Sequence, residues 1–205
     1  MEIKIPYTPR KHQKLLHQQI DKHRWSVLVC HRRFGKTVCM INHLIKSALT
    51  CKEKNPRFAY LAPTFKQAKS IAWDYMKQFT DKIPNTKFNE TELRVDLPNG
   101  ARITLLGSDS PDGLRGIYLD GCVIDEYANV NSRLFPEIIR PALSDRKGYC
   151  VFIGTPAGMN NNFYELYQHA NGADDWFNYK AKASDTKIVD EDELVKAKEV
   201  MGEKK

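Results

Sequence analysis

Residues 26–37, with the sequence SVLVCHRRFGKT, join an apolar run to a helix-forming run through a short polar loop. The first five residues are typical of a buried strand, and apolar residues recur at helical spacing from Lys36 onward. The free N–H groups at the start of such a helix bind anions. In this setting the Lys36 ammonium reaches phosphate oxygens and the Thr37 hydroxyl ligates Mg²⁺. The stretch therefore predicts a phosphate-binding loop.

Two features of this loop are unusual. The common pattern begins with glycine, where this chain has Cys30. The loop also contains Arg32 and Arg33, and an arginine there can neutralise the charge that develops on a γ-phosphate during its transfer. The alternative is that either arginine is only a surface charge, and Arg32 is the stronger functional candidate.

A second polar motif follows another apolar run, at residues 121–126 with the sequence GCVIDE. Asp125 is expected to hold hydrated Mg²⁺, and Glu126 to orient or deprotonate an attacking water. Paired acids at this place can instead cap a helix. A glutamate directly after the magnesium-binding aspartate favours hydrolysis, and so a motor-type ATPase.

The remaining sequence alternates between strand and helix patterns. Residues 93–97 and 101–105 flank Pro98-Asn99-Gly100 and predict a β-hairpin. The fold class is therefore α/β, a three-layer P-loop NTPase of the ASCE (RecA-like) kind with a mostly parallel central sheet plus a hairpin. Its ligand should lie just after Val29, Ile124 and Ile153, where strands end. We expect strands at residues 26–30, 58–62, 121–125, 149–154 and 176–181, and helices at residues 11–23, 36–52, 67–79, 132–143 and 160–170.

Composition sets broader limits. The 205 residues suffice for one well-buried domain, and the net charge of +7 favours a polyanionic partner such as nucleic acid. Five cysteines without a CxxC pair argue against a disulfide framework or a zinc site. No apolar run approaches the roughly 18 residues of a membrane span. The N-terminus has no signal-peptide pattern, so the cytosol is the default.

Together these residues resemble the large terminase subunit, the ATPase that drives DNA into the capsids of tailed bacteriophages. The resemblance covers almost the whole chain, and its order and spacing are highly specific. It is carried by RRFGKT at residues 32–37, YLAPTFKQA at 60–68, LPNG at 97–100, GSD at 107–109, LRG at 114–116, VIDE at 123–126 and GTP at 154–156.

The resemblance implies roles for further residues. The family's loop tolerates a first residue other than glycine and carries an arginine four residues before the lysine, here Arg32. Gln13 is expected to bind adenine, or else to be a surface glutamine. Thr155 is expected to sense the γ-phosphate and relay its state to DNA-gripping elements, or else to cap a helix. Arg115 is expected to reach the ATP of a neighbouring subunit, and the choice between Arg32 and Arg115 as arginine finger stays open. The nucleotide-binding set is Gln13, Arg32, Arg33, Phe34, Gly35, Lys36 and Thr37, the metal-binding pair is Thr37 and Asp125, and the catalytic set is Glu126, Arg32, Arg115 and Thr155.

The resemblance also implies cofactors and partners. ATP and Mg²⁺ are expected, with double-stranded DNA, the portal of the procapsid and the small terminase subunit as partners. The chain should be a monomer in isolation and part of a homo-oligomeric ring when assembled, in the host cell cytoplasm and away from membranes. Residues 1–183 are expected to form the ATPase domain, and residues 184–205 a linker toward a C-terminal nuclease domain. We expect no nuclease activity and no second metal site in this chain.

Two other functions remain open. The first motor domain of a helicase shares a glutamine-containing entry motif, GKT and an Asp-Glu pair, although the hairpin and the Leu-Arg-Gly element favour the packaging motor. A nucleotide-gated DNA-binding module would bind ATP without turnover. The presence of Glu126 argues against that module.

Overall fold

A computed structural model describes residues 4–109 and 111–186. Its centre is one eight-stranded sheet in the order β3-β4-β5-β2-β6-β7-β1-β8, in which β1, β2 and β5 to β8 are parallel and the β3–β4 and β4–β5 pairs are antiparallel. The predicted mostly parallel sheet with an added hairpin is confirmed. The strands are β1 Trp25–Cys30, β2 Arg57–Ala62, β3 Lys87–Asn89, β4 Arg94–Asp96, β5 Arg102–Gly107, β6 Gly121–Ile124, β7 Tyr149–Gly154 and β8 Trp176–Ala181.

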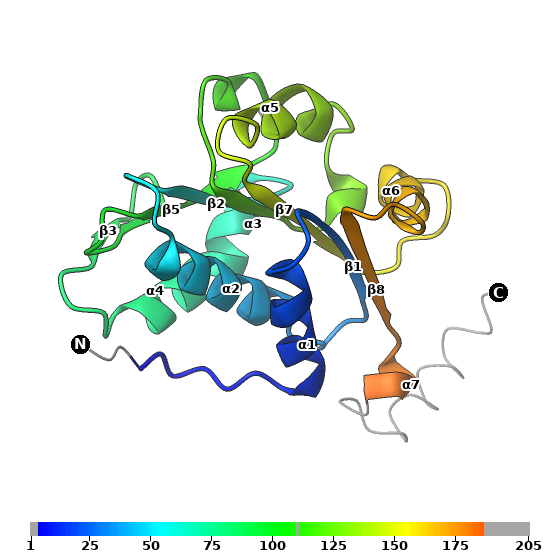
Figure 1. The fold of residues 1–205 in the computed structure, drawn as a ribbon, viewed down its shortest axis with the longest axis horizontal. Coiled ribbons are helices and arrows are strands. Elements are labelled where there is room, and N and C mark those ends of the chain that lie inside the picture. The colour runs from blue at the N-terminus through cyan, green and yellow to red at the C-terminus, as the bar shows by residue number, and fades with distance from the viewer. Residues whose placement is uncertain (1–3, 110, 187–205) are drawn as a thin grey trace.

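Helices cover both faces of the sheet and make three layers (Figure 1). The helices α1 Lys11–Ile20 and α2 Lys36–Thr50 pack on one face, and α5 Arg140–Ala142 and α6 Asn162–Ala170 lie over the other. The inner strands are buried on both faces, so their side chains alternate between two cores. In β1, for example, Leu28 and Cys30 belong to the core under α2, and Val27 and Val29 to the opposite core.

The helix predicted at residues 67–79 is longer and contains a wider turn. It comprises α3 Phe65–Ala68, a π-helical turn Lys69–Trp73 and α4 Asp74–Thr80. Thr64 caps its start: its hydroxyl accepts from the Gln67 N–H at 3.2 Å, and the Gln67 side chain accepts from the Thr64 N–H at 3.1 Å. The helix therefore begins two residues before the predicted start.

The helix predicted at residues 132–143 is shorter and also contains a wider turn. The helical residues are 134–142, with a π-helical turn Phe135–Ile139 followed directly by the single turn α5. Pro136 and Pro141 lack an N–H and cannot take part in a continuous helical hydrogen-bond ladder. Shorter elements without a clear pattern, namely β3, the 3₁₀ turns Pro111–Leu114 and Tyr127–Asn129 and the helix α7 Ala183–Thr186, were not predicted.

The predicted hairpin also connects the sheet edge to a helix. Gly100 adopts a positive φ of 83° in its turn, and the Asn99 amide donates to the carbonyl of Ala48 at 2.8 Å near the end of α2. The turn is therefore docked on the helix that follows the phosphate-binding loop.

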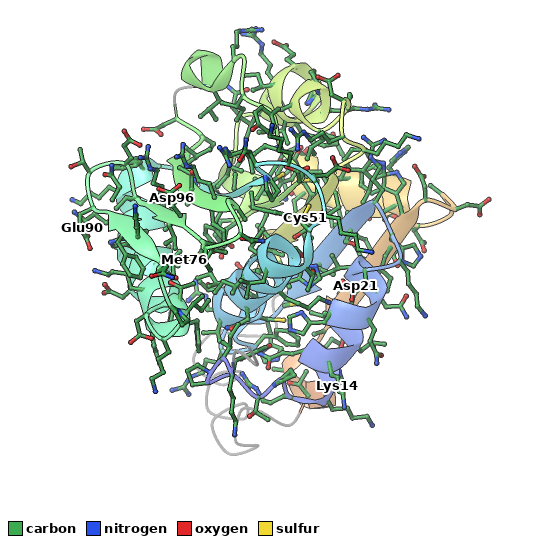
Figure 2. The ribbon with its side chains drawn as sticks, turned by 60° about the vertical axis from the view of Figure 1, so that its left-hand side comes forward. Lys14, Asp21, Cys51, Met76, Glu90 and Asp96 are labelled. Atoms are coloured by element: carbon green, nitrogen blue, oxygen red, sulfur yellow. The ribbon has the colours of Figure 1, made fainter. Side chains whose placement is uncertain are left out.

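Helices α1 and α2 are joined by a row of polar contacts. The imidazole of His17 stacks on that of His43 with ring centroids 5.2 Å apart, and Lys46 forms an ion pair with Asp21 at 2.5 Å. Asp21 and Cys51, just beyond α1 and α2, line one cavity at the same end of the two helices (Figure 2). This row holds α1 against the helix that begins at Lys36.

The tail is described only as far as Thr186. The side chains of His31 and Thr186 are hydrogen-bonded at 2.8 Å, so α7 contacts the loop after β1. Most of the predicted linker, residues 187–205, lies outside the described residues. Within the described part of the chain, no helix combines the length and apolar character that crossing a bilayer requires.

The histidine pair predicts a loss of stability on acidification. Burial lowers the pKa of His17 from 6.5 to about 4 and holds that of His43 well below its ordinary value. Between pH 6.5 and 4 the unfolded chain therefore binds protons that the folded chain does not, and stability falls as the pH falls. Urea unfolding at pH 7 and pH 5 should show a smaller loss for His17→Gln, since each histidine contributes about 1.4 kcal/mol per pH unit in this window. His169→Gln, which removes an exposed histidine from α6, is the control, and an unchanged pH dependence in His17→Gln would contradict the prediction.

Candidate nucleotide-binding site

Three polar segments meet at one edge of the sheet. Strands β6, β7 and β1 are neighbours and parallel, so their carboxyl ends lie together. The phosphate-binding loop follows β1, the Asp125-Glu126 pair follows β6, and Thr155 follows β7. The structure thus brings together the segments that the sequence placed at strand ends.

The loop between β1 and α2 is held by its own backbone and by one aromatic anchor. Arg33 and Gly35 have positive φ values of 69° and 83°, and α2 begins at Lys36. Phe34 is buried, with its ring against those of His31 and Tyr179. This arrangement leaves the first N–H groups of α2 at the loop, as an anion site requires.

Two side chains from the start of α1 support the loop from outside. The Arg10 guanidinium donates to the carbonyl of Phe34 at 3.0 Å, and the Gln13 amide donates to that of Gly35 at 3.3 Å. The side-chain carbonyl of Gln13 accepts a hydrogen bond from the backbone N–H of Arg10 at 3.0 Å. Gln13 is buried, unlike the surface glutamine of the alternative interpretation. Its predicted contact with adenine stays a prediction.

Gly35 is favoured by its φ of 83°, which side chains rarely adopt. A Cβ at this position would also lie 2.6 Å from an Arg10 guanidinium nitrogen and 3.0 Å from the Gln13 amide nitrogen, so these two flexible side-chain ends would have to move away from the loop.

The acids after β6 occupy different environments. Asp125 is 3% exposed, and its carboxylate accepts from the hydroxyl of Tyr60 and from the Glu126 N–H. Burial raises the pKa of Asp125, whereas the Tyr60 hydrogen bond and the charge of Lys36 lower it. The Lys36 ammonium and the Asp125 carboxylate are therefore close enough to interact electrostatically, although β7 lies between the strands that precede them.

Glu126 lies on a turn of unusual backbone geometry. Its φ and ψ of 46° and 48° are left-handed, which is uncommon for a residue with a side chain. The Thr155 hydroxyl donates to its carboxylate at 3.4 Å. The turn thus directs Glu126 toward the residue that follows β7, and strain at such positions clusters in functional sites.

The oxygen donors suit magnesium. The Thr37 hydroxyl and the Asp125 carboxylate provide hard oxygen ligands, and Mg²⁺ commonly takes one or two protein oxygens together with phosphate and water. Among residues 4–109 and 111–186, no group of three or more His, Cys, Asp or Glu side chains could hold a metal ion by itself. The residues fit a magnesium ion shared with a phosphate ligand.

The candidate arginines lie in two places. Arg32 and Arg33 are exposed on the loop itself. Arg115 precedes β6, its side chain is 54% exposed, and its guanidinium lies 3.9 Å from the Glu137 carboxylate in the layer over the opposite face of the sheet.

The contacts of Arg10 and Tyr60 at this site were not predicted from the sequence. A tyrosine within an apolar strand needs a hydrogen-bond partner, and that was the available signal for Tyr60.

The strand order, the loop after β1 and the acids after β6 define a P-loop nucleoside triphosphatase of the RecA-like class. Residues 29–203 match the family described as "Terminase large subunit, T4likevirus-type, N-terminal". The chain belongs to this family of large terminase N-terminal domains.

Individual relatives agree with this assignment. The large terminase subunits of Thermus phage G20c and Thermus virus P23-45 are each 30% identical over 182 residues, covering 80% of this chain and 36% of the relative. The chain thus spans about a third of the length of these curated relatives.

Solved structures show the same fold. The large terminase ATPase domain of Thermus phage P74-26 aligns with a TM-score of 0.79 at 21% identity, over 98% of this chain and 91% of that one. The large terminase of a thermophilic bacteriophage, in complex with ADP, aligns with a TM-score of 0.77 at 16% identity, over 92% of this chain and 49% of that one.

Gly35→Ala tests the fit between α1 and the loop. A Cβ adds the strain of a left-handed backbone and displaces Arg10, so affinity for ADP should fall roughly tenfold or more, about 1.4 kcal/mol. Gly158→Ala is the matched control, because Gly158 has a φ of 84° and its Cβ would meet nothing within 4 Å. Titration with a fluorescent ADP measures both variants, and equal affinity in the two would contradict this account of the loop.

Proposed function

We propose that this chain is the ATP-hydrolysing motor domain of a large terminase subunit, which drives double-stranded DNA into a procapsid. The convergence of Lys36, Asp125 and Glu126 at one sheet edge supports hydrolysis. Membership of the large terminase family supports the role in packaging.

The proposed reaction is the attack of water on the γ-phosphorus of ATP. The Lys36 ammonium and the N–H groups at the start of α2 hold the phosphates. Thr37 and Asp125 would hold a magnesium ion, which when bound would supply positive charge beside the phosphate oxygens. Glu126 orients the water and accepts its proton while the bond to the β–γ bridging oxygen breaks, which gives ADP and phosphate.

An arginine can neutralise the negative charge that develops on the γ-phosphate in this reaction. Arg32 is on the loop of the same subunit, whereas the exposed Arg115 suits the site of a neighbouring subunit in a homo-oligomeric ring. Such an arginine typically contributes about 10³-fold or more to the rate. If Arg115 supplies it, the isolated chain is a slow ATPase.

Thr155 is proposed to couple hydrolysis to movement. Its hydroxyl donates to Glu126, and the exposed segment at residues 156–160 follows it directly. A change in the position of Glu126 on loss of the γ-phosphate would therefore alter this hydrogen bond and the segment after it. Gln13 is proposed to select ATP through adenine.

The net charge of the chain and its family membership support the proposed partners. A net charge of +7 suits binding to DNA phosphates. The portal, the small terminase subunit and other copies of the chain complete the assembly in the host cytoplasm. DNA-stimulated phosphate release, by this chain alone and fused to a C-terminal nuclease region, tests the motor role, whereas separation of a forked duplex would favour a helicase.

Glu126→Gln separates catalysis from binding. The amide cannot accept the proton of water, so phosphate release should fall by about 10²-fold or more while ATP still binds. Lys36→Ala is the contrasting variant, since it removes a phosphate contact and should weaken ATP binding itself. Phosphate release by Glu126→Gln at the wild-type rate would remove the catalytic assignment of this residue.

A further inference from the structure

One buried phenol contacts the carboxylate that is proposed to hold magnesium. Tyr60, in the middle of β2, has no exposed surface. Its hydroxyl donates to the carboxylate of Asp125. Asp125 lies 65 positions further along the chain, in the motif after β6, to which Tyr60 does not belong.

Strand register explains how these two distant residues meet. Tyr60 pairs with Val123 in the parallel β2–β6 ladder, and the Asp125 N–H donates to the carbonyl of Leu61 at 2.7 Å. Since side chains alternate along a strand, Val123 and Asp125 lie on the same face. Tyr60 and Val123 both belong to the core under α2, the helix that carries Thr37 in its first turn.

The chemistry of a phenol suits this position. A tyrosine hydroxyl has one proton to donate and oxygen lone pairs to accept with. Here the proton is directed at Asp125, so this hydrogen bond holds the carboxylate in a fixed orientation. Mg²⁺ demands near-ideal octahedral geometry and is sensitive to such orientation.

We propose that Tyr60 is a positioning residue that sets the orientation of Asp125 for the magnesium of the bound nucleotide. The inference rests on the proposed function, because it assumes a magnesium–nucleotide complex at this site. Residues that hydrogen-bond to metal ligands typically contribute 10- to 100-fold to metal affinity.

Tyr60→Phe tests the inference because it removes a single oxygen and keeps the ring in the core. Binding of a fluorescent, non-hydrolysable ATP analogue is measured in magnesium and in EDTA. Affinity in magnesium should fall about 10-fold or more, and affinity in EDTA should match that of the wild type. Binding of Mn²⁺ to the nucleotide complex, followed by the EPR signal of free Mn²⁺, should weaken by a similar factor.

Tyr149→Phe is the matched control. Tyr149 is a partly buried tyrosine packed against the same core. Its hydroxyl donates to the Ser47 hydroxyl of α2 at 3.0 Å, toward the opposite end of that helix. Its affinities in both buffers should equal those of the wild type.

The outcomes separate this inference from the proposed function. Wild-type affinity of Tyr60→Phe in magnesium, or an equal loss in magnesium and EDTA, would overturn the positioning role only. Failure of the wild-type chain to bind the analogue in either buffer would overturn the proposed function, and the inference with it.

Discussion

The buried carboxylate of Asp125 is the constraint around which the site is organised. A carboxylate with 3% exposure is costly unless other groups compensate for lost water. The Tyr60 hydroxyl, the Glu126 N–H and the charge of Lys36 provide that compensation. They arrive from β2, from the turn after β6 and from the start of α2, so the strand order β2-β6-β7-β1 is needed to assemble them. A magnesium ion would complete the set of partners.

The phosphate-binding loop depends on a second set of contacts. Its left-handed backbone at Arg33 and Gly35 is maintained from outside by Arg10 and Gln13 at the start of α1. The stacked histidines and the Asp21–Lys46 ion pair fix the rest of α1 along α2. The helix α1 therefore supports the loop from outside. This contact explains why the polar side chain of Gln13 is buried.

The sequence predicted those features that depend on local patterns. The hairpin around Asn99-Gly100 and the inner strands follow from apolar runs and turn residues, and the structure confirms them. The loop and the acids likewise lie after β1 and β6, where the sequence placed them. Other features depend on contacts between distant segments, such as Tyr60 with Asp125 or Arg10 with the loop, and no spacing signals them. The wider turn within the helix at residues 134–142 could have been inferred from Pro136 and Pro141, but the helical periodicity outweighed them.

A crystal structure of the chain with Mn²⁺ and a non-hydrolysable ATP analogue would test the central claim most directly, because anomalous scattering locates the metal. The account predicts one manganese peak bound to the Thr37 hydroxyl at about 2.1 Å, beside the Asp125 carboxylate, with the γ-phosphate between Lys36 and Glu126. A metal or triphosphate bound elsewhere, with Asp125 still enclosed by protein alone, would contradict it.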